Sequence, residues 1–221
     1  MFLKIFGTGF IFLLVFSSVQ ASANEISSSS IEFGGGTALE FIEAGSKESL
    51  NRQLRHEAKL GRISRIEKLI REGADVNAAA EYGETALYYA ILFGRVKAAL
   101  RLIELGANPN SKDDMDHTPL LKAAEDCNFR VVDALLKAGA DVNHADYFGR
   151  TALINASESN CIRAVAVILT RAKGRVQIEA EDNYFHNARD YAQHPWVQQM
   201  LDLATGKITA ESVTLPNLKL P

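Results

Sequence analysis

The sequence predicts an all-α solenoid of stacked helix-turn-helix units joined by β-hairpin loops. The main observation is that residues recur at a fixed step of 33 on both sides of the segment 116–148. The polar and small positions that repeat are Thr85, Thr118 and Thr151; Gly73, Gly106 and Gly139; and Asn77, Asn110 and Asn143. Such a period is the sequence signature of a stack of similar supersecondary units.

A second observation is an apolar stripe that recurs in every copy. Its members are Ile63, Val96, Phe129 and Ile162; Ile66, Ala99, Val132 and Val165; Leu69, Leu102, Leu135 and Ile168; and Ile70, Ile103, Leu136 and Leu169. Within a copy these residues lie at i, i+3, i+6 and i+7, so they share one face of a helix about 100° wide. We expect this face to form the core.

The third observation is the set of helix boundary signals. Thr118-Pro119 predicts the start of a shorter preceding helix, because Thr caps the first turn and Pro fits the first helical position. Glycine at the end of each copy supplies a left-handed residue. Gly83 and Gly149 precede the capping Thr by two residues, and Asp116 takes that place in the middle copy. We expect positive φ at all three.

These features resemble the ankyrin repeat family, which has this period and a T-P-L-H-x-A signature. The resemblance rests on GETALYYA, DHTPLLKAA and GRTALINA (83–90, 116–124 and 149–156) and on GADVN, GANPN and GADVN (73–77, 106–110 and 139–143). It covers about residues 49 to 204 and implies an ankyrin-repeat solenoid that binds a protein partner.

The chain departs from the family pattern at two kinds of position. Tyr88, Leu121 and Ile154 stand where the family has a histidine, so we expect packing there in place of a hydrogen bond. The glycine between the two helices is kept in the first two copies and becomes Cys127 and Asn160 in the next two, which predicts less regular turns.

Outside the repeats, the sequence suggests several separate segments. An apolar run after Lys4, ending in Ala21-Ser22-Ala23, predicts a cleavable signal peptide, with an uncleaved membrane anchor as the alternative. The expected segments are a signal peptide (1–23), a Ser/Gly-rich linker (24–36), the repeat domain (37–204) and a tail (205–221). Within the domain we expect a helix from Thr37 that covers the first copy, an N-terminal capping repeat (50–82), repeats at 83–115, 116–148 and 149–185, and C-terminal capping helices (186–204).

The closing helix pair should span Ala188 to Leu203, with its second helix starting at His194-Pro195. Trp196 is expected to cover the core. After Leu169 the 33-residue pattern is interrupted, because Ala172-Lys173 stand where the other copies have Gly-Ala. Gly174 predicts a longer turn at this point.

Composition and motifs argue against catalysis. A net charge of -3 gives no reason to expect nucleic acid. The sequence has no nucleophile elbow, Gly-rich phosphate loop or His pair at i, i+4, so we predict no enzyme activity, no cofactor and no metal. Cys127 and Cys161 are expected as free thiols, because a disulfide needs Cα atoms about 4.4–6.8 Å apart and neighbouring helices pack at about 8–10 Å. An oxidising compartment leaves a bridge as the alternative.

The solenoid should present an elongated groove made by the hairpin tips and the inner face of the first helices. The candidate protein-binding residues in it are Glu81, Tyr82, Glu84, Leu92, Phe93, Lys112, Asp114, Met115, His117, Glu125, Asp126, Tyr147, Phe148, Arg150 and Glu158. Tyr82, Met115 and Phe148 form one row, which Phe185 would extend. Exposed aromatic and Met side chains favour protein binding; the alternative is that the tips only stiffen one another.

We therefore predict a non-catalytic interaction scaffold, exported to the periplasm or outside the cell, that binds a protein partner in this groove. The chain is expected to be monomeric, without nucleic acid and without membrane attachment after signal cleavage. The alternatives are a secreted host-directed effector and an accessory subunit of an enzyme. Convergence of the charged groove residues in one pocket would favour the enzyme alternative.

Overall fold

The computed structural model describes residues 32–33, 36–172 and 174–207, and it divides into two compact units at Gly45. The predicted signal peptide and nearly all of the predicted tail lie outside the described residues. In the first unit, β1 (Glu32–Phe33) pairs antiparallel with β2 (Gly36–Thr37). This short hairpin falls at the end of the segment predicted as a linker.

The helix expected to cover the first copy is not a separate element. Instead, α2 (Ala38–Leu60) is one helix of 23 residues that runs directly into the first helix of the first repeat. In the second unit Leu54 and Ala58 of α2 are buried in the hydrophobic core. None of the helices in the described part of the chain is long and apolar enough to span a bilayer.

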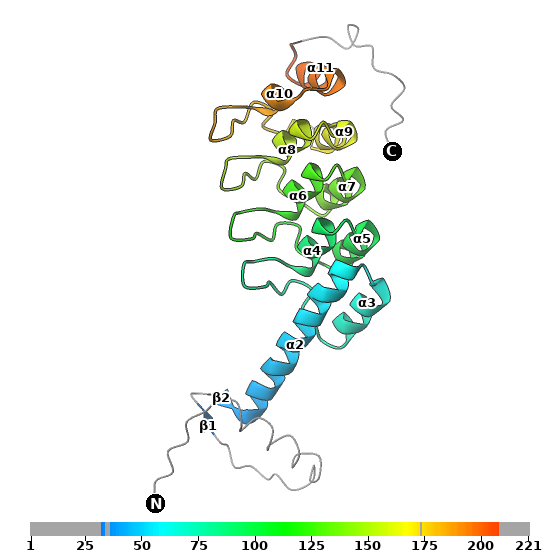
Figure 1. The fold of residues 1–221 in the computed structure, drawn as a ribbon, viewed down its shortest axis with the longest axis vertical. Helices are drawn as coiled ribbons and strands as arrows, with labels where there is room; N and C mark the ends of the chain where they lie inside the picture. Colours follow the sequence, from blue (N-terminus) through cyan, green and yellow to red (C-terminus); the bar gives the residue numbers. More distant parts are fainter. Residues whose placement is uncertain (1–31, 34–35, 173, 208–221) are drawn as a thin grey trace, which may run out of the picture. The chain divides into compact units, whose positions relative to one another are not determined.

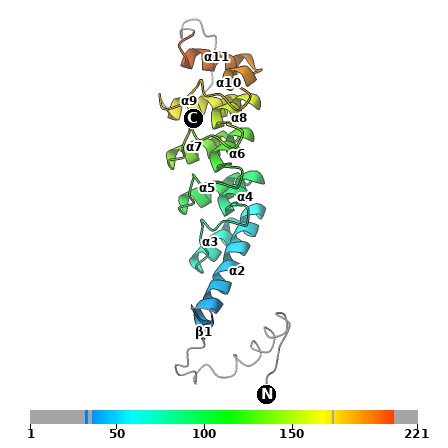
Figure 2. The same cartoon turned by 90° about the vertical axis from the view of Figure 1, so that its left-hand side faces the viewer.

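The second unit is a stack of helix pairs, as Figure 1 shows for residues 46–172 and 174–207. After α2 the helices are α3 (Ile63–Arg71), α4 (Ala86–Leu92), α5 (Val96–Glu104), α6 (Pro119–Glu125), α7 (Phe129–Lys137), α8 (Ala152–Glu158), α9 (Ile162–Arg171), α10 (Ala188–Tyr191) and α11 (Pro195–Ala204). The first helices α4, α6, α8 and α10 form one column, and α5, α7, α9 and α11 form a second column beside it (Figures 1 and 2). The loops between repeats all project on the side of the first helices. This arrangement confirms the predicted fold class.

The apolar stripe forms the core, and the side chains at its two middle positions are the most deeply buried. Leu102, Leu135 and Ile168 are fully buried, as are Ile66 and Val132 in the neighbouring position. The two outer positions of the stripe are only partly buried and pack against this core. The 33-residue step thus places equivalent side chains in equivalent layers between successive repeats.

Each short first helix begins where the sequence predicted. The hydroxyl oxygens of Thr85, Thr118 and Thr151 accept hydrogen bonds from the amides three residues later, at 3.3–3.4 Å. Each threonine therefore satisfies one of the free N–H groups of the first turn. Asp116 has φ of 59° and Gly149 has φ of 80°, which confirms the left-handed conformation expected two residues before the cap.

The repeating asparagine ties each loop to the next one. Asn77 accepts a hydrogen bond from the amide of Asn108 at 2.7 Å and donates to the carbonyl of Gly106 at 3.4 Å. Asn110 makes the same two bonds to Asp141 and Gly139. An asparagine side chain can make both bonds, because its carbonyl oxygen accepts and its NH₂ group donates. This explains why asparagine recurs at this position.

The turns between paired helices correct two expectations. Cys127 and Asn160 have φ of 57° and 53°, close to the 64° of Gly94, so these turns are as regular as the glycine turns. Cys127 and Cys161 are joined by a disulfide, with Cα atoms 5.0 Å apart, where free thiols were expected. The expectation was wrong because it used the spacing between helix axes. The cysteines lie at the turns, where the backbones of adjacent repeats approach more closely.

The fourth repeat contains three extra residues. The asparagine bond between loops spans 31 residues in the middle repeats, but Asn143 bonds to the amide of Gln177, 34 residues away. Gly174, with φ of 70°, lies in this longer turn, as predicted. The register after Gly174 is therefore shifted by three relative to the 33-residue step.

The last helix begins at Pro195 and is capped by the ring of His194, which accepts a hydrogen bond from the amide of Trp196. Val197 and Leu201 are buried against the core. Trp196 was expected to cover the core with them. It is only partly buried and instead lies beside the His194 ring, with ring centroids 5.3 Å apart.

Candidate functional site

Four loops with hairpin geometry, here called the hairpins, project from the stack at residues 78–85, 111–118, 144–151 and 180–187. Each is closed by a backbone hydrogen bond, for example from the amide of Asp146 to the carbonyl of Arg150 at 3.1 Å. Adjacent hairpins are joined at their tips by one backbone bond per pair. The amides of Asp114, Tyr147 and Asn183 donate to the carbonyls of Tyr82, Met115 and Phe148 at 2.9–3.1 Å. The tips therefore brace one another through the backbone.

A carboxylate supports each of the last three tips from within. One oxygen of Asp113 accepts hydrogen bonds from the amides of Met115 and His117, at 2.9 and 2.8 Å. Asp146 and Asp182 make the equivalent bonds in the next two hairpins. In the first hairpin Ala80 takes this place. The tip conformation is fixed by the backbone and these aspartates, so it does not depend on the residue at the tip.

The side chains at the tips are exposed. Tyr82 is 60% exposed, Met115 40% and Phe148 39%. The predicted extension of this row to Phe185 is wrong, because the three extra residues of the fourth repeat shift the register. Phe185 has φ of 63° and occupies the place of Gly149, whereas Tyr184, 66% exposed, occupies the place of Phe148. We call Tyr82, Met115, Phe148 and Tyr184 the hairpin row.

Most of the other predicted groove residues are also exposed, and several form ion pairs with neighbours on the same surface. Glu81, Asp114, Tyr147 and Glu158 are among the exposed ones. The ion pairs join Lys112 to Asp116 at 3.2 Å, Lys122 to Glu125 and Asp126 at 3.0 and 3.2 Å, and Arg150 to Glu158. Partial burial favours the neutral amine of Lys122, but hydrogen bonds to Glu125 and Asp126 outweigh it and raise the pKa.

Three of the predicted residues, Glu84, His117 and Arg150, are only half-buried. His117 and Arg150 make contacts within the protein. The ring of His117 lies 3.0 Å from Asp113 and 3.7 Å from Asp146, so it bridges two hairpins. The guanidinium of Arg150 lies 5.4 Å from the ring centre of Tyr191. These side chains are less available to a partner than the sequence suggested.

The ends of the first helices add an apolar group at the N-terminal side of the stack. Leu60, Leu92 and Phe93 are 38–40% exposed. The ammonium of Lys59 lies 4.5 Å from the ring centre of Phe93. At the equivalent positions of the next repeats the chain has Glu125, Asp126 and Glu158. The surface formed by the hairpins and the C-terminal ends of α4, α6 and α8 is called the inner surface below.

Sequence reasoning missed two features of this surface. Tyr88, expected only to pack, is half-buried beside acidic groups; burial and then the negative charges of Asp113, Glu125 and Glu84 raise its pKa to about 12. Tyr184 was missed because the repeat pattern is weak after Leu169. The position of the three-residue insertion could therefore not be located from the sequence. By contrast, Leu121 and Ile154 are fully buried, so packing replaces the family's histidine there as predicted.

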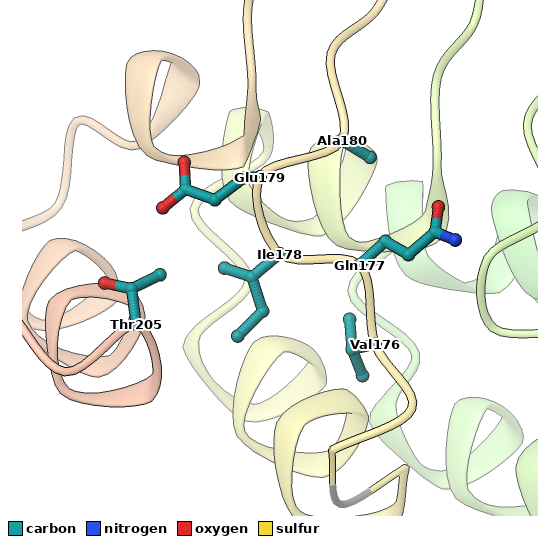
Figure 3. A pocket seen from close by; sticks show the side chains of 6 residues that line it. All are labelled: Val176, Gln177, Ile178, Glu179, Ala180 and Thr205. Atoms are coloured by element: carbon teal, nitrogen blue, oxygen red, sulfur yellow. The ribbon is translucent and has the colours of Figure 1, made fainter.

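The charged residues are spread over successive hairpins and helix ends along the inner surface. A shallow pocket of about 530 Å³ lies elsewhere, in the loop before the last hairpin, and is lined by Val176, Gln177, Ile178, Glu179, Ala180 and Thr205 (Figure 3). It contains none of the predicted site residues, and its carboxylate Glu179 pairs with Lys207 at 3.3 Å. Across residues 32–33, 36–172 and 174–207 no three His, Cys, Asp or Glu side chains form a group that could hold a metal ion.

Comparison with known proteins identifies the family. A family model of ankyrin repeats in three copies matches residues 43–113 and 106–182, which is more than half of the chain. A search of curated proteins returned no match. Ankyrin repeat domains are generally non-catalytic modules for protein–protein interaction. The step of 33 residues, the stacked helix pairs, the projecting hairpins and the family match together show that this chain belongs to the ankyrin repeat family.

Proposed function

We propose that this protein is a non-catalytic scaffold, exported to the periplasm or outside the cell, that binds a protein partner along its inner surface. The observation that carries the proposal is the hairpin row. Its members recur at equivalent positions and remain 39–66% exposed, although backbone bonds already join the tips. Large exposed aromatic and Met side chains are the kind that contribute most to protein interfaces.

The alternative that the tips merely stiffen one another finds little support in the side chains. The bonds between tips use amides and carbonyls, and the supporting aspartates also bind amides. Neither set of contacts requires Tyr, Met or Phe at the tip. These bonds therefore leave the side chains of the hairpin row available to a partner, although the ring of Phe148 also packs edge-on against that of Tyr147, with ring centres 5.5 Å apart.

Two observations support export. The sequence before Asn24 has the pattern of a cleavable signal peptide. The disulfide between Cys127 and Cys161 fits an oxidising compartment, because protein disulfides are rare in a reducing cytosol. N-terminal sequencing of the protein from a cell fraction tests this part: a chain beginning at Asn24 supports export, and an intact Met1 in a membrane fraction overturns it.

The binding proposal is tested with a triple variant in which Tyr82, Met115 and Phe148 are changed to serine. The partner is first captured from a periplasmic extract with the wild-type chain and identified. If each side chain contributes about 1–2 kcal/mol, the triple change should weaken partner affinity by about a hundredfold or more. The melting temperature should change little.

The opposite result would refute the role of the hairpin row. A triple variant that melts at a lower temperature and still binds the partner with wild-type affinity would show that the tips are structural. The search would then move to Leu92, Phe93, Glu125, Asp126 and Glu158 at the ends of the first helices. A matched control changes three exposed outer residues, Arg65, Lys97 and Arg130, to serine.

A further inference from the structure

The repeat domain has a strong charge asymmetry between its inner surface and its outer helices. The four hairpins, α4, α6, α8 and the capping residues at their C-terminal ends carry eleven carboxylates and three side-chain cations. The carboxylates are Glu81, Glu84, Asp113, Asp114, Asp116, Glu125, Asp126, Asp146, Glu158, Glu181 and Asp182. The second helices α3, α5, α7 and α9, with the capping residues at their C-terminal ends, carry nine cations and four carboxylates. The net charge of the whole chain hides this separation.

The few cations of the inner surface are already paired. Lys112, Lys122 and Arg150 each form an ion pair with a carboxylate of the same surface. In contrast, Glu81, Asp114 and Glu181 are exposed and take part in none of the ion pairs found among the described residues. The surface therefore keeps unneutralised negative charge.

Two of these carboxylates lie directly beside the hairpin row, and Glu181 lies at the base of the last hairpin. Glu81 precedes Tyr82 in the chain and Asp114 precedes Met115, at the tips of adjacent hairpins. Acidic groups also lie around Tyr88 on α4, where burial first and then the negative charges of Asp113, Glu125 and Glu84 raise the pKa of the phenol to about 12. Apolar contact area and negative charge are thus combined along one surface.

We propose that the partner presents a cationic segment, rich in arginine or lysine and interrupted by apolar residues, to this surface. The inference rests on the proposed protein-binding function and specifies the chemistry of the partner. Its cations would lie beside Glu81, Asp114 and Glu181, and its apolar side chains would contact the hairpin row. Arginine fits best, because its planar guanidinium pairs with carboxylates and also stacks on the rings of Tyr82 and Tyr184. Anionic partners such as nucleic acid would be repelled.

Three fluorescent peptides of equal length test this proposal against the full chain. One alternates arginine with leucine, one replaces each arginine by glutamate, and one replaces each leucine by serine. The Arg–Leu peptide should bind, and its affinity should fall by about tenfold between about 50 and 300 mM salt, as expected for screened charge pairs. The other two should bind at least about tenfold more weakly, because one lacks the charge and the other the apolar contact.

Matched protein variants locate the effect. Glu81→Gln with Asp114→Asn removes two charges beside the hairpin row, and Glu72→Gln with Glu104→Gln removes two exposed charges on the outer side. The first pair should weaken binding of the Arg–Leu peptide by about fivefold, and the second by less than about twofold. Equal effects of the two pairs, equal binding of the Glu–Leu peptide, or no binding of the Arg–Leu peptide up to about 1 mM overturns the proposal.

The failure of this inference can be told apart from failure of the proposed function. If capture of the natural partner depends on Tyr82, Met115 and Phe148 but not on salt or on Glu81 and Asp114, the inner surface binds a partner of other chemistry. In that case only the charge inference is overturned. If both the natural partner and the Arg–Leu peptide bind the triple serine variant as well as wild type, both proposals are overturned.

Discussion

The second helices and the hairpins use the same 33-residue step for opposite purposes. In the helices, the step places Leu102, Leu135 and Ile168 in successive buried layers, each fully excluded from solvent. In the hairpins, it places Tyr82, Met115 and Phe148 at successive exposed tips. Cohesion in the first region comes from side chains, whereas in the second it comes from backbone bonds and from the aspartates beneath the tips.

The difference shows which positions the fold constrains. A buried helix position must hold an apolar side chain of the right volume, because a smaller one leaves a cavity. A tip needs only its amide and carbonyl, so its side chain can be chosen for binding. The following predictions test this division, beginning with the largest expected loss of stability.

Leu135→Ala should lower the free energy of unfolding by about 2–5 kcal/mol, because it opens a cavity in the core between repeats. Chemical denaturation of the purified protein measures this loss. Lys137→Ala is the control, since Lys137 lies on the same helix with an exposed side chain and an ion pair to Asp133 at 2.6 Å. Similar losses for both variants would show that the buried layer is misplaced.

Loss of the disulfide should cost about 2–4 kcal/mol, because the bond closes a long loop between adjacent repeats. Cys127→Ser with Cys161→Ser removes it. A sharper variant combines Cys127→Gly with Cys161→Ser, since Cys127 has the left-handed φ found at Gly94. Glycine relieves a conformational cost of about 1–2 kcal/mol, so this variant should be the more stable of the two. Equal stability of both variants would contradict a strained backbone at Cys127.

Asp182→Asn should destabilise the last hairpin by about 1–2 kcal/mol at pH 7, because the carboxylate accepts bonds from two amides and from the Tyr191 hydroxyl at 2.6 Å. Burial favours the protonated acid, but these bonds outweigh it and lower the pKa of Asp182. The stabilisation is therefore present above the unfolded pKa of about 3.9 and is lost as pH falls through the lower folded value. Denaturation curves between about pH 6 and pH 3 should show the wild-type advantage shrinking. A constant difference over this range would be evidence against a charge effect.

Single serine substitutions at Tyr82, Met115 and Phe148 should each change stability by less than about 0.5 kcal/mol, as is usual for surface positions. The reason is that the hydrogen bonds between tips use no side-chain atom of these three residues. Thermal melting of the three single variants beside Leu135→Ala measures the contrast. A loss above about 1 kcal/mol at any tip would mean that its side chain also supports the fold.

The sequence by itself determined the repeat architecture and its local chemistry. The 33-residue step, the Thr caps and the left-handed position of Asp116 follow from local rules of helix termini and turns, and all are present in the structure. The sequence also placed most of the candidate binding residues on the exposed inner surface. These features were accessible because periodicity and backbone preferences act over a few residues.

Tertiary structure alone decided the features that depend on distances between repeats. The disulfide forms because the turns at Cys127 and Cys161 bring their Cα atoms to 5.0 Å, a distance that the helix spacing does not reveal. The tip position of the last hairpin is occupied by Tyr184, where Phe185 had been predicted. The difference arises from a three-residue insertion, which the bond between Asn143 and Gln177 reveals. His117 and Arg150 were predicted as free groove residues, yet His117 contacts Asp146 of the next hairpin and Arg150 contacts Tyr191 of α10. Sequence spacing fixes neighbours along one helix, but the closeness of two repeats depends on how all their side chains pack together.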